Sequence, residues 1–121
     1  MITMTPSILI VDDHPSFRAS ARRMLEADGY EVIGEAQDGA AALEAVERLR
    51  PELVLLDVRL PDVNGLEFAR RLLGADGRTP EIVLISSHDS TDFGEAIIAS
   101  GASGFIPKAE LSAKAITSLI T

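Results

Sequence analysis

The chain has 121 residues, enough for one domain with a hydrophobic core, and its 19 acidic and 11 basic side chains give a net charge of −8. This surplus of negative charge argues against general binding to nucleic acid, because no excess of basic side chains is present to neutralise phosphates. The absence of cysteine excludes disulfides and thiolate metal sites, and no apolar run is long enough to span a membrane, so we expect a cytoplasmic domain without a membrane partner.

Five short apolar runs along the chain predict strands. A continuous apolar run is typical of a strand that is covered on both faces, whereas alternation of apolar and polar residues suits the edge of a sheet. The second run alternates in this way. The strands are expected at Ser7–Val11, Glu31–Ala36, Leu53–Leu56, Glu81–Ile85 and Gly104–Ile106.

An amphipathic segment follows each of these runs and predicts a helix. Asp38 and Asn64 are suited to cap two of the helices, and Pro51 is suited to stop one. The helices are expected over Ser16–Asp28, from Asp38 to Pro51, from Asn64 to about Leu73, over about Thr91–Ser100 and from about Leu111 to the end. Four glycines are interpreted as turn or helix-end residues, namely Gly29, Gly65, Gly101 and Gly104.

This alternation of strands and helices with short loops predicts an α/β fold. We expect a doubly wound, five-stranded parallel sheet in a flavodoxin-like three-layer sandwich. Right-handed crossovers fit the strand order 2-1-3-4-5. In that order the first and third strands flank the point where the strand order reverses, and ligands bind beyond their carboxyl ends. Residues 1–121 are expected to form a single domain of this kind.

Polar or charged residues stand at the carboxyl ends of four of the five strands. Asp12 and Asp13 follow the first strand, and Asp57 ends the third. Ser86 follows the fourth strand, and Lys108 comes just after the fifth. A single residue of this kind is common in solvated loops, but the convergence of five on one crevice is hard to explain by loop composition.

These residue types suit phosphoryl transfer beside a divalent cation. Three carboxylates with backbone or water oxygens make a hard-oxygen site for Mg²⁺. A carboxylate held near Mg²⁺ can attack a phosphoryl group whose charge the metal spreads. A lysine ammonium supplies a further compact positive charge, and a serine hydroxyl can bond a phosphoryl oxygen.

Three segments together resemble the receiver domain of two-component response regulators. They are I-L-I-V-D-D-H-P, L-V-L-L-D-V-R-L-P-D-V-N-G and G-A-S-G-F-I-P-K-A-E, and the resemblance covers essentially the whole chain. It implies that Asp57 is the phosphoacceptor. It also implies that Asp12 and Asp13 hold Mg²⁺ with Asp57, and that the backbone carbonyl of Arg59 is a further ligand.

The resemblance also implies a switch and a phosphodonor. Ser86 and Lys108 would contact the phosphoryl group, and Phe105 would change rotamer on activation. The donor would be a sensor histidine kinase. The domain would therefore be a signalling phosphoacceptor that catalyses only its own phosphorylation and dephosphorylation, rather than an enzyme for external substrates.

The opening D-D-H-P is similar to a subgroup of regulators with a C-terminal helix-turn-helix DNA-binding domain. The resemblance implies a stand-alone receiver or, as we prefer, the N-terminal part of a longer transcription regulator. DNA would then be bound only through the output domain. A homodimer through the fourth helix, fifth strand and fifth helix, or through another helical face, is a further expectation.

Two other functions fit parts of the pattern. A Mg²⁺-dependent aspartyl phosphohydrolase also uses a strand-end Asp as nucleophile, but normally has a general-acid Asp two residues later, where this chain has Arg59. A flavodoxin-like cofactor binder needs a hydroxyl- and glycine-rich loop after the first strand, where this chain has D-D-H-P-S. His14 is explained by a cap-region or surface role at least as readily as by contact with a phosphodonor, and His88 as a loop residue.

Overall fold

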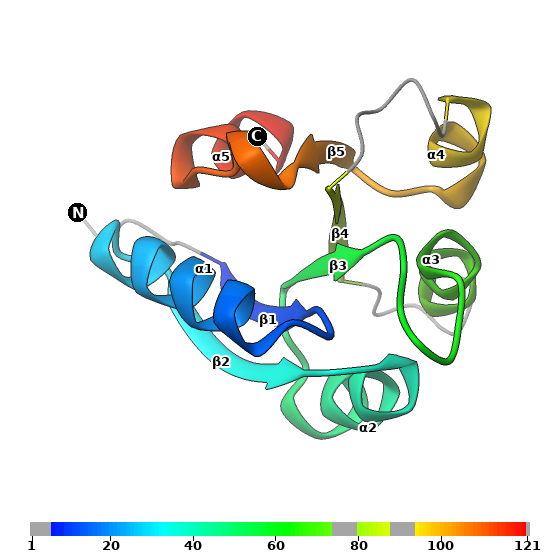
Figure 1. Cartoon of the computed structure of the whole chain (residues 1–121), viewed down its shortest axis with the longest axis horizontal. Coiled ribbons are helices and arrows are strands. Elements are labelled where there is room, and N and C mark those ends of the chain that lie inside the picture. The colour runs from blue at the N-terminus through cyan, green and yellow to red at the C-terminus, as the bar shows by residue number, and fades with distance from the viewer. Residues whose placement is uncertain (1–5, 74–79, 88–93, 121) are drawn as a thin grey trace.

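The described part of the computed structural model, residues 6–73, 80–87 and 94–120, contains one five-stranded parallel sheet (Figure 1). Neighbouring strands pair in the order β2-β1-β3-β4-β5, which confirms the predicted topology. The strands are β1 (Ser7–Val11), β2 (Glu31–Ala36), β3 (Leu53–Asp57), β4 (Glu81–Ser86) and β5 (Gly104–Pro107).

Helices follow each strand, as the sequence predicts. They are α1 (Pro15–Ala27), α2 (Gly39–Leu49), α3 (Gly65–Leu73), α4 (Gly94–Ser100) and α5 (Ala113–Ile120), with a short 3-10 helix η2 (Lys108–Glu110) before the last. The expected start of the fourth helix at Thr91 lies outside the described residues. None of the helices in the described ranges is both long and apolar enough to cross a membrane.

Alternate strand residues enter two separate cores, one on each face of the sheet. Ile8 and Ile10 of β1 join the core beneath α1 and α5, whereas Leu9 and Val11 join the core beneath α2, α3 and α4. Figure 1 shows the same division, with α1 and α5 on one side of the sheet and the other three helices on the opposite side. The period of two along each strand therefore covers both faces with apolar side chains.

Side-chain caps fix the start of two helices close to the carboxyl edge of the sheet. The carboxylate of Asp38 accepts a hydrogen bond from the Ala41 amide at 2.8 Å, which confirms its predicted role at the start of α2. The side-chain oxygen of Asn64 accepts from the Leu66 amide at 2.8 Å at the start of α3. Each cap satisfies an amide that the helix leaves unpaired, and so defines where the preceding loop ends.

Candidate functional site

The register of the sheet brings the polar strand-end residues to one edge. The last residue pair between β1 and β3 directly precedes Asp12 and Asp57, so these two residues are neighbours across the strands. The last pair between β4 and β5 joins Ser86 to the residue before Lys108. The strand register therefore brings these four residues to the same edge of the sheet, as the sequence predicts.

Asp12 and Asp57 form a buried carboxylate pair that shares one ammonium group. The side chain of Asp12 has no solvent exposure, and Asp57 is 4% exposed. The Lys108 ammonium lies 2.5 Å from Oδ2 of Asp12 and 3.1 Å from Oδ2 of Asp57. Its long side chain thus reaches from the end of β5 across β4 to the central strands, and the ammonium also lies 4.5 Å from the centre of the Phe17 ring.

The environment moves the pKa values of the two carboxyls in opposite directions. Burial is the main cause that raises the pKa of Asp57, the negative Asp12 raises it further, and the Arg59 amide and Lys108 offset only part of this. Burial also acts to raise the pKa of Asp12, but its interactions with the Lys108 ammonium, the His14 amide and the Asp57 carboxyl outweigh it, so the pKa is lowered. Asp12 therefore holds its negative charge firmly, whereas the charge on Asp57 is costly without a further cation.

Asp13 and His14 lie beside Asp12 and Asp57 on the solvent side of this edge, and we call these four residues the acidic cluster. The Nδ1 atom of His14 lies 3.1 Å from Oδ1 of Asp12 and 3.1 Å from Oδ1 of Asp13. One potential ligand atom from each of these residues and from Asp57 can be chosen so that all four lie within 4.8 Å of one another. The buried Oδ2 of Asp12 makes no hydrogen bond of regular geometry with the described residues, although Lys108 is its ion-pair partner.

This donor set fits a divalent cation. Carboxylate oxygens are the ligands that Mg²⁺ prefers, and Mg²⁺ usually keeps several waters beside one or two protein carboxylates. Asp12 is held in place by burial, while Asp13 is 37% exposed and open to solvent. Asp12, Asp13 and Asp57 are therefore the residues that could hold Mg²⁺.

The loop between β3 and α3 folds back tightly on the end of β3. The Arg59 amide donates to Oδ1 of Asp57 at 2.9 Å, and the Gly65 amide donates to the Val58 carbonyl at 2.7 Å. A Cβ atom on Gly65 would collide with the backbone of Asp57 and Val58. Gly65 is thus more than a helix-end residue, because its lack of a side chain lets α3 begin against the strand end that carries Asp57.

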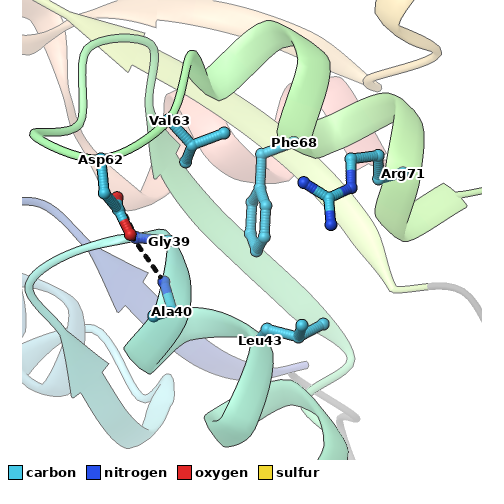
Figure 2. Close-up of a pocket in the computed structure, with 7 residues that line it drawn as sticks. All are labelled: Gly39, Ala40, Leu43, Asp62, Val63, Phe68 and Arg71. Atoms are coloured by element: carbon cyan, nitrogen blue, oxygen red, sulfur yellow. Dashed lines mark hydrogen bonds between the residues drawn. The ribbon is translucent and has the colours of Figure 1, made fainter.

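A second link joins this loop to α2. The carboxylate of Asp62 accepts hydrogen bonds from the amides of Gly39 at 2.7 Å and Ala40 at 3.0 Å (Figure 2). These bonds are the main cause of the lowered pKa of Asp62. The amino end of α2 is therefore attached to the loop that follows Asp57.

A pocket of about 220 Å³ lies beside this attachment, between α2 and α3 (Figure 2). Its lining residues are Gly39, Ala40, Leu43, Asp62, Val63, Phe68 and Arg71. Phe68 points into the space between the two helices in Figure 2. None of the strand-end carboxylates lines it, so it is distinct from the acidic cluster.

Sequence reasoning missed two residues of α1, Arg18 and Phe17, that contact the site. The Arg18 guanidinium donates to the backbone carbonyl of Asp12 at 2.6 Å and to the Glu35 carboxylate at 3.0 Å. Phe17 supports the Lys108 ammonium. The only signal available was their place in the first turn after D-D-H-P, since the first turn of a helix that starts beside a strand end brings some of its side chains close to that end.

The two predicted switch residues, Ser86 and Phe105, lie on the neighbouring strands β4 and β5. Ser86 is 1% exposed at the end of β4, and Phe105 of β5 is half-buried against the core under α2, α3 and α4. Their contact with a phosphoryl group and the rotamer change remain predictions, as does the Arg59 carbonyl ligand. His88 lies outside the described residues.

Comparisons with known proteins agree on one family. The family model for the response regulator receiver domain matches residues 8–120. The chain is 38% identical to the nitrate/nitrite response regulator protein NarP of Escherichia coli (strain K12), over 84% of this chain and 47% of that protein. It is 36% identical to the transcriptional regulatory protein DegU of Brevibacillus brevis, over 90% of this chain and 46% of that protein.

A solved structure extends the similarity to three dimensions. The two-component response regulator of the LuxR family from Aurantimonas sp. SI85-9A1 has a TM-score of 0.85 and 33% identity, over 96% of this chain and 85% of that one. By contrast, the chain spans about half the length of the curated relatives it matches.

Proposed function

The chain belongs to the response regulator receiver domain family, a phosphoacceptor family of two-component signalling, and we propose that Asp57 is the residue that accepts the phosphoryl group. One observation carries this assignment. Asp57 is a buried carboxylate at the carboxyl end of β3, with Asp12 beside it and the Lys108 ammonium 3.1 Å away. A nucleophile, a place for a divalent cation and a fixed positive charge thus meet at one point.

In the proposed reaction, a carboxylate oxygen of Asp57 attacks the phosphorus atom of the donor. The bond between phosphorus and the donor nitrogen or oxygen breaks, and the leaving group keeps the electron pair. Lys108 offsets negative charge on the phosphoryl oxygens, because its ammonium already lies between the two buried carboxylates. Asp12, Asp13, Asp57 and the Arg59 carbonyl would hold Mg²⁺, which supplies charge neutralisation when bound.

Phosphorylation would then be transmitted through Ser86 and Phe105. The hydroxyl of Ser86 would move to the phosphoryl group, and the half-buried Phe105 ring would take the space released. The affected surface is formed by α4, β5 and α5, where Ile98 of α4 is 82% exposed. An exposed large apolar side chain there supports the proposal that this face contacts an output domain or a second copy of the chain.

We infer the partners of this chain from its family and from the greater length of its relatives. We propose that a sensor histidine kinase in the cytoplasm is the phosphodonor, and that an output domain beyond these residues binds DNA and controls transcription. The relatives named above are transcriptional and response regulators about twice as long as this chain. A net charge of −8 makes the receiver itself a poor surface for DNA.

Intact-mass spectrometry with acetyl phosphate and Mg²⁺ tests the assignment. Wild type should gain one phosphoryl group, and Asp57→Asn should gain none. Asp38→Asn is the matched control, because Asn caps a helix as well as Asp does and the label should be retained. Equal labelling of wild type and Asp57→Asn would refute the assignment. Steady turnover of an external phosphomonoester would instead favour a phosphohydrolase.

A further inference from the structure

We propose that His14 is a nitrogen ligand of the acidic site, so that this receiver binds imidazole-preferring ions such as Zn²⁺ through His14 Nδ1 as well as through carboxylates. The inference rests on the proposed metal site and adds a residue that sets which metal is preferred. It starts from the position of one atom. His14 Nδ1 lies 3.1 Å from a carboxylate oxygen of Asp12 and 3.1 Å from one of Asp13.

The backbone places His14 at the mouth of the site independently of its side chain. Its amide donates to Oδ1 of Asp12 at 2.8 Å, and the residue is the N-cap of α1. The imidazole makes no cap hydrogen bond to the helix. The ring is therefore not needed to start α1; its Nδ1 instead lies within hydrogen-bond distance of Oδ1 of Asp12, at 3.1 Å.

The spacing of the three atoms matches ligands around one ion. Donors at right angles around a metal with bonds of about 2.1 Å are about 3.0 Å apart. Donors in a tetrahedral site with similar bonds are slightly farther apart, at about 3.4 Å. Both observed separations of 3.1 Å fall in this range.

Hydrogen bonding alone leaves this arrangement incompletely satisfied. A neutral imidazole has at most one proton on Nδ1, and that proton can be directed well at only one acceptor. Two carboxylate oxygens lie at equal distance from the nitrogen. A cation in place of the proton would bond all three atoms at once.

The burial of Asp12 is a second observation that supports a cation at this site. Asp12 has no solvent exposure, and its Oδ2 makes no regular hydrogen bond with the described residues. Such a group is stable when paired with cations, and Lys108 supplies only one. A metal bound by Asp12, Asp13 and His14 would supply the second.

Nitrogen ligation has a specific consequence for metal choice. Mg²⁺ favours oxygen ligands, whereas imidazole suits Zn²⁺ and its neighbours among the transition metals. Removal of the imidazole should therefore weaken Zn²⁺ and leave Mg²⁺ almost unchanged. This difference separates a ligand from a residue that merely adjusts the charge of the cluster, which would alter both ions alike.

Imidazole ¹⁵N NMR of the whole chain with Zn²⁺ tests the proposal, because the chain has only two histidines, His14 and His88. At mildly alkaline pH, Zn²⁺ should shift the Nδ1 resonance of one histidine to the position of a metal-bound nitrogen. The shifted resonance should be missing in His14→Gln and present in His88→Gln. Calorimetry should show Zn²⁺ binding to His14→Gln weakened at least ten-fold, the loss that even an outer-shell partner of a ligand causes, with Mg²⁺ binding almost unchanged.

Two results would overturn the proposal. One is a Zn²⁺-shifted nitrogen that persists in His14→Gln or disappears in His88→Gln. The other is an equal loss of Zn²⁺ and Mg²⁺ affinity in His14→Gln. Neither result would affect Asp57, because Mg²⁺-dependent labelling of Asp57 is measured separately by mass. His14→Gln should keep the wild-type circular dichroism spectrum, since the His14 side chain is 64% exposed.

Discussion

The ammonium of Lys108 lies 2.5 Å from the buried carboxylate of Asp12, although the two residues follow strands at different positions in the sheet. The pKa of Lys108 is raised: burial opposes the charge, but the two carboxylates outweigh it. Lys108 therefore stays charged and joins the end of β5 to the ends of the central strands. Its loss would leave Asp12 buried with one fewer cation.

Replacement of Lys108 by Met should destabilise the metal-free protein. Removing one partner of a buried ion pair costs about 3 kcal/mol, because the remaining charge is left without compensation. Urea unfolding in EDTA measures this, and Lys114→Met on the exposed surface of α5 is the control. Mg²⁺ should recover part of the loss. Equal stability of the two variants in EDTA would show that Lys108 does not compensate Asp12.

Replacement of Gly65 by Ala should disturb both stability and phosphorylation. The added Cβ meets backbone atoms of Asp57 and Val58, which cannot rotate away as a flexible side chain can. Overpacking of this kind costs about 1–3 kcal/mol, and the strand end that carries Asp57 must move. Urea unfolding and the rate of Mg²⁺-dependent labelling should both change. Glu67→Ala, on the exposed face of the same helix, should change neither by as much.

The sequence was sufficient to predict the sheet and the residues that gather at its edge. The predicted bounds of β1 and β2 agree with the structure. The apolar run of β1 stops before the charged Asp12, and the alternating run of β2 lies between two turns. The parallel order then places every strand-end polar residue on one side. Nothing more than periodicity and the handedness of crossovers is needed for this step.

The contacts that refine the site were beyond the sequence. The support of Lys108 by Phe17 depends on the direction of two side chains more than ninety positions apart. The approach of Gly65 to the Asp57 backbone depends on how the loop folds back. The fifth helix starts at Ala113 rather than about Leu111, because Lys108–Glu110 form a separate 3-10 turn and Ser112 caps the helix that follows.

Beryllofluoride with Mg²⁺, which takes the place of the phosphoryl group, should perturb residues beyond the acidic edge. The two conformations need differ by only a few kcal/mol for such binding to shift the population. Amide NMR signals should therefore move at Ser86, at Phe105 and along α4. Asp57→Asn should show none of these shifts. Changes confined to Asp12, Asp13 and Asp57 in wild type would contradict the proposed switch through Phe105.

Asp57→Asn should be more stable than wild type in EDTA at neutral pH. The pKa of Asp57 is raised in the folded protein, by burial first and by Asp12 next. A carboxyl whose folded pKa exceeds its unfolded value, which is close to 4, contributes stability below that value and loses it as the pH rises through the folded pKa. The neutral amide escapes this loss, so the melting temperature of the mutant should exceed that of wild type increasingly above pH 4.

The difference should shrink when Mg²⁺ is added, because Mg²⁺ binds the ionised carboxylates of the folded protein and stabilises it by mass action. Asp57→Asn removes one of those carboxylates and should bind Mg²⁺ less tightly. Thermal melts of both proteins in EDTA and in Mg²⁺, from about pH 4 to 8, follow the difference upward from the unfolded pKa of a carboxyl. A mutant that melts below wild type in EDTA throughout this range would show that the charge on Asp57 is already compensated by Lys108 without any metal.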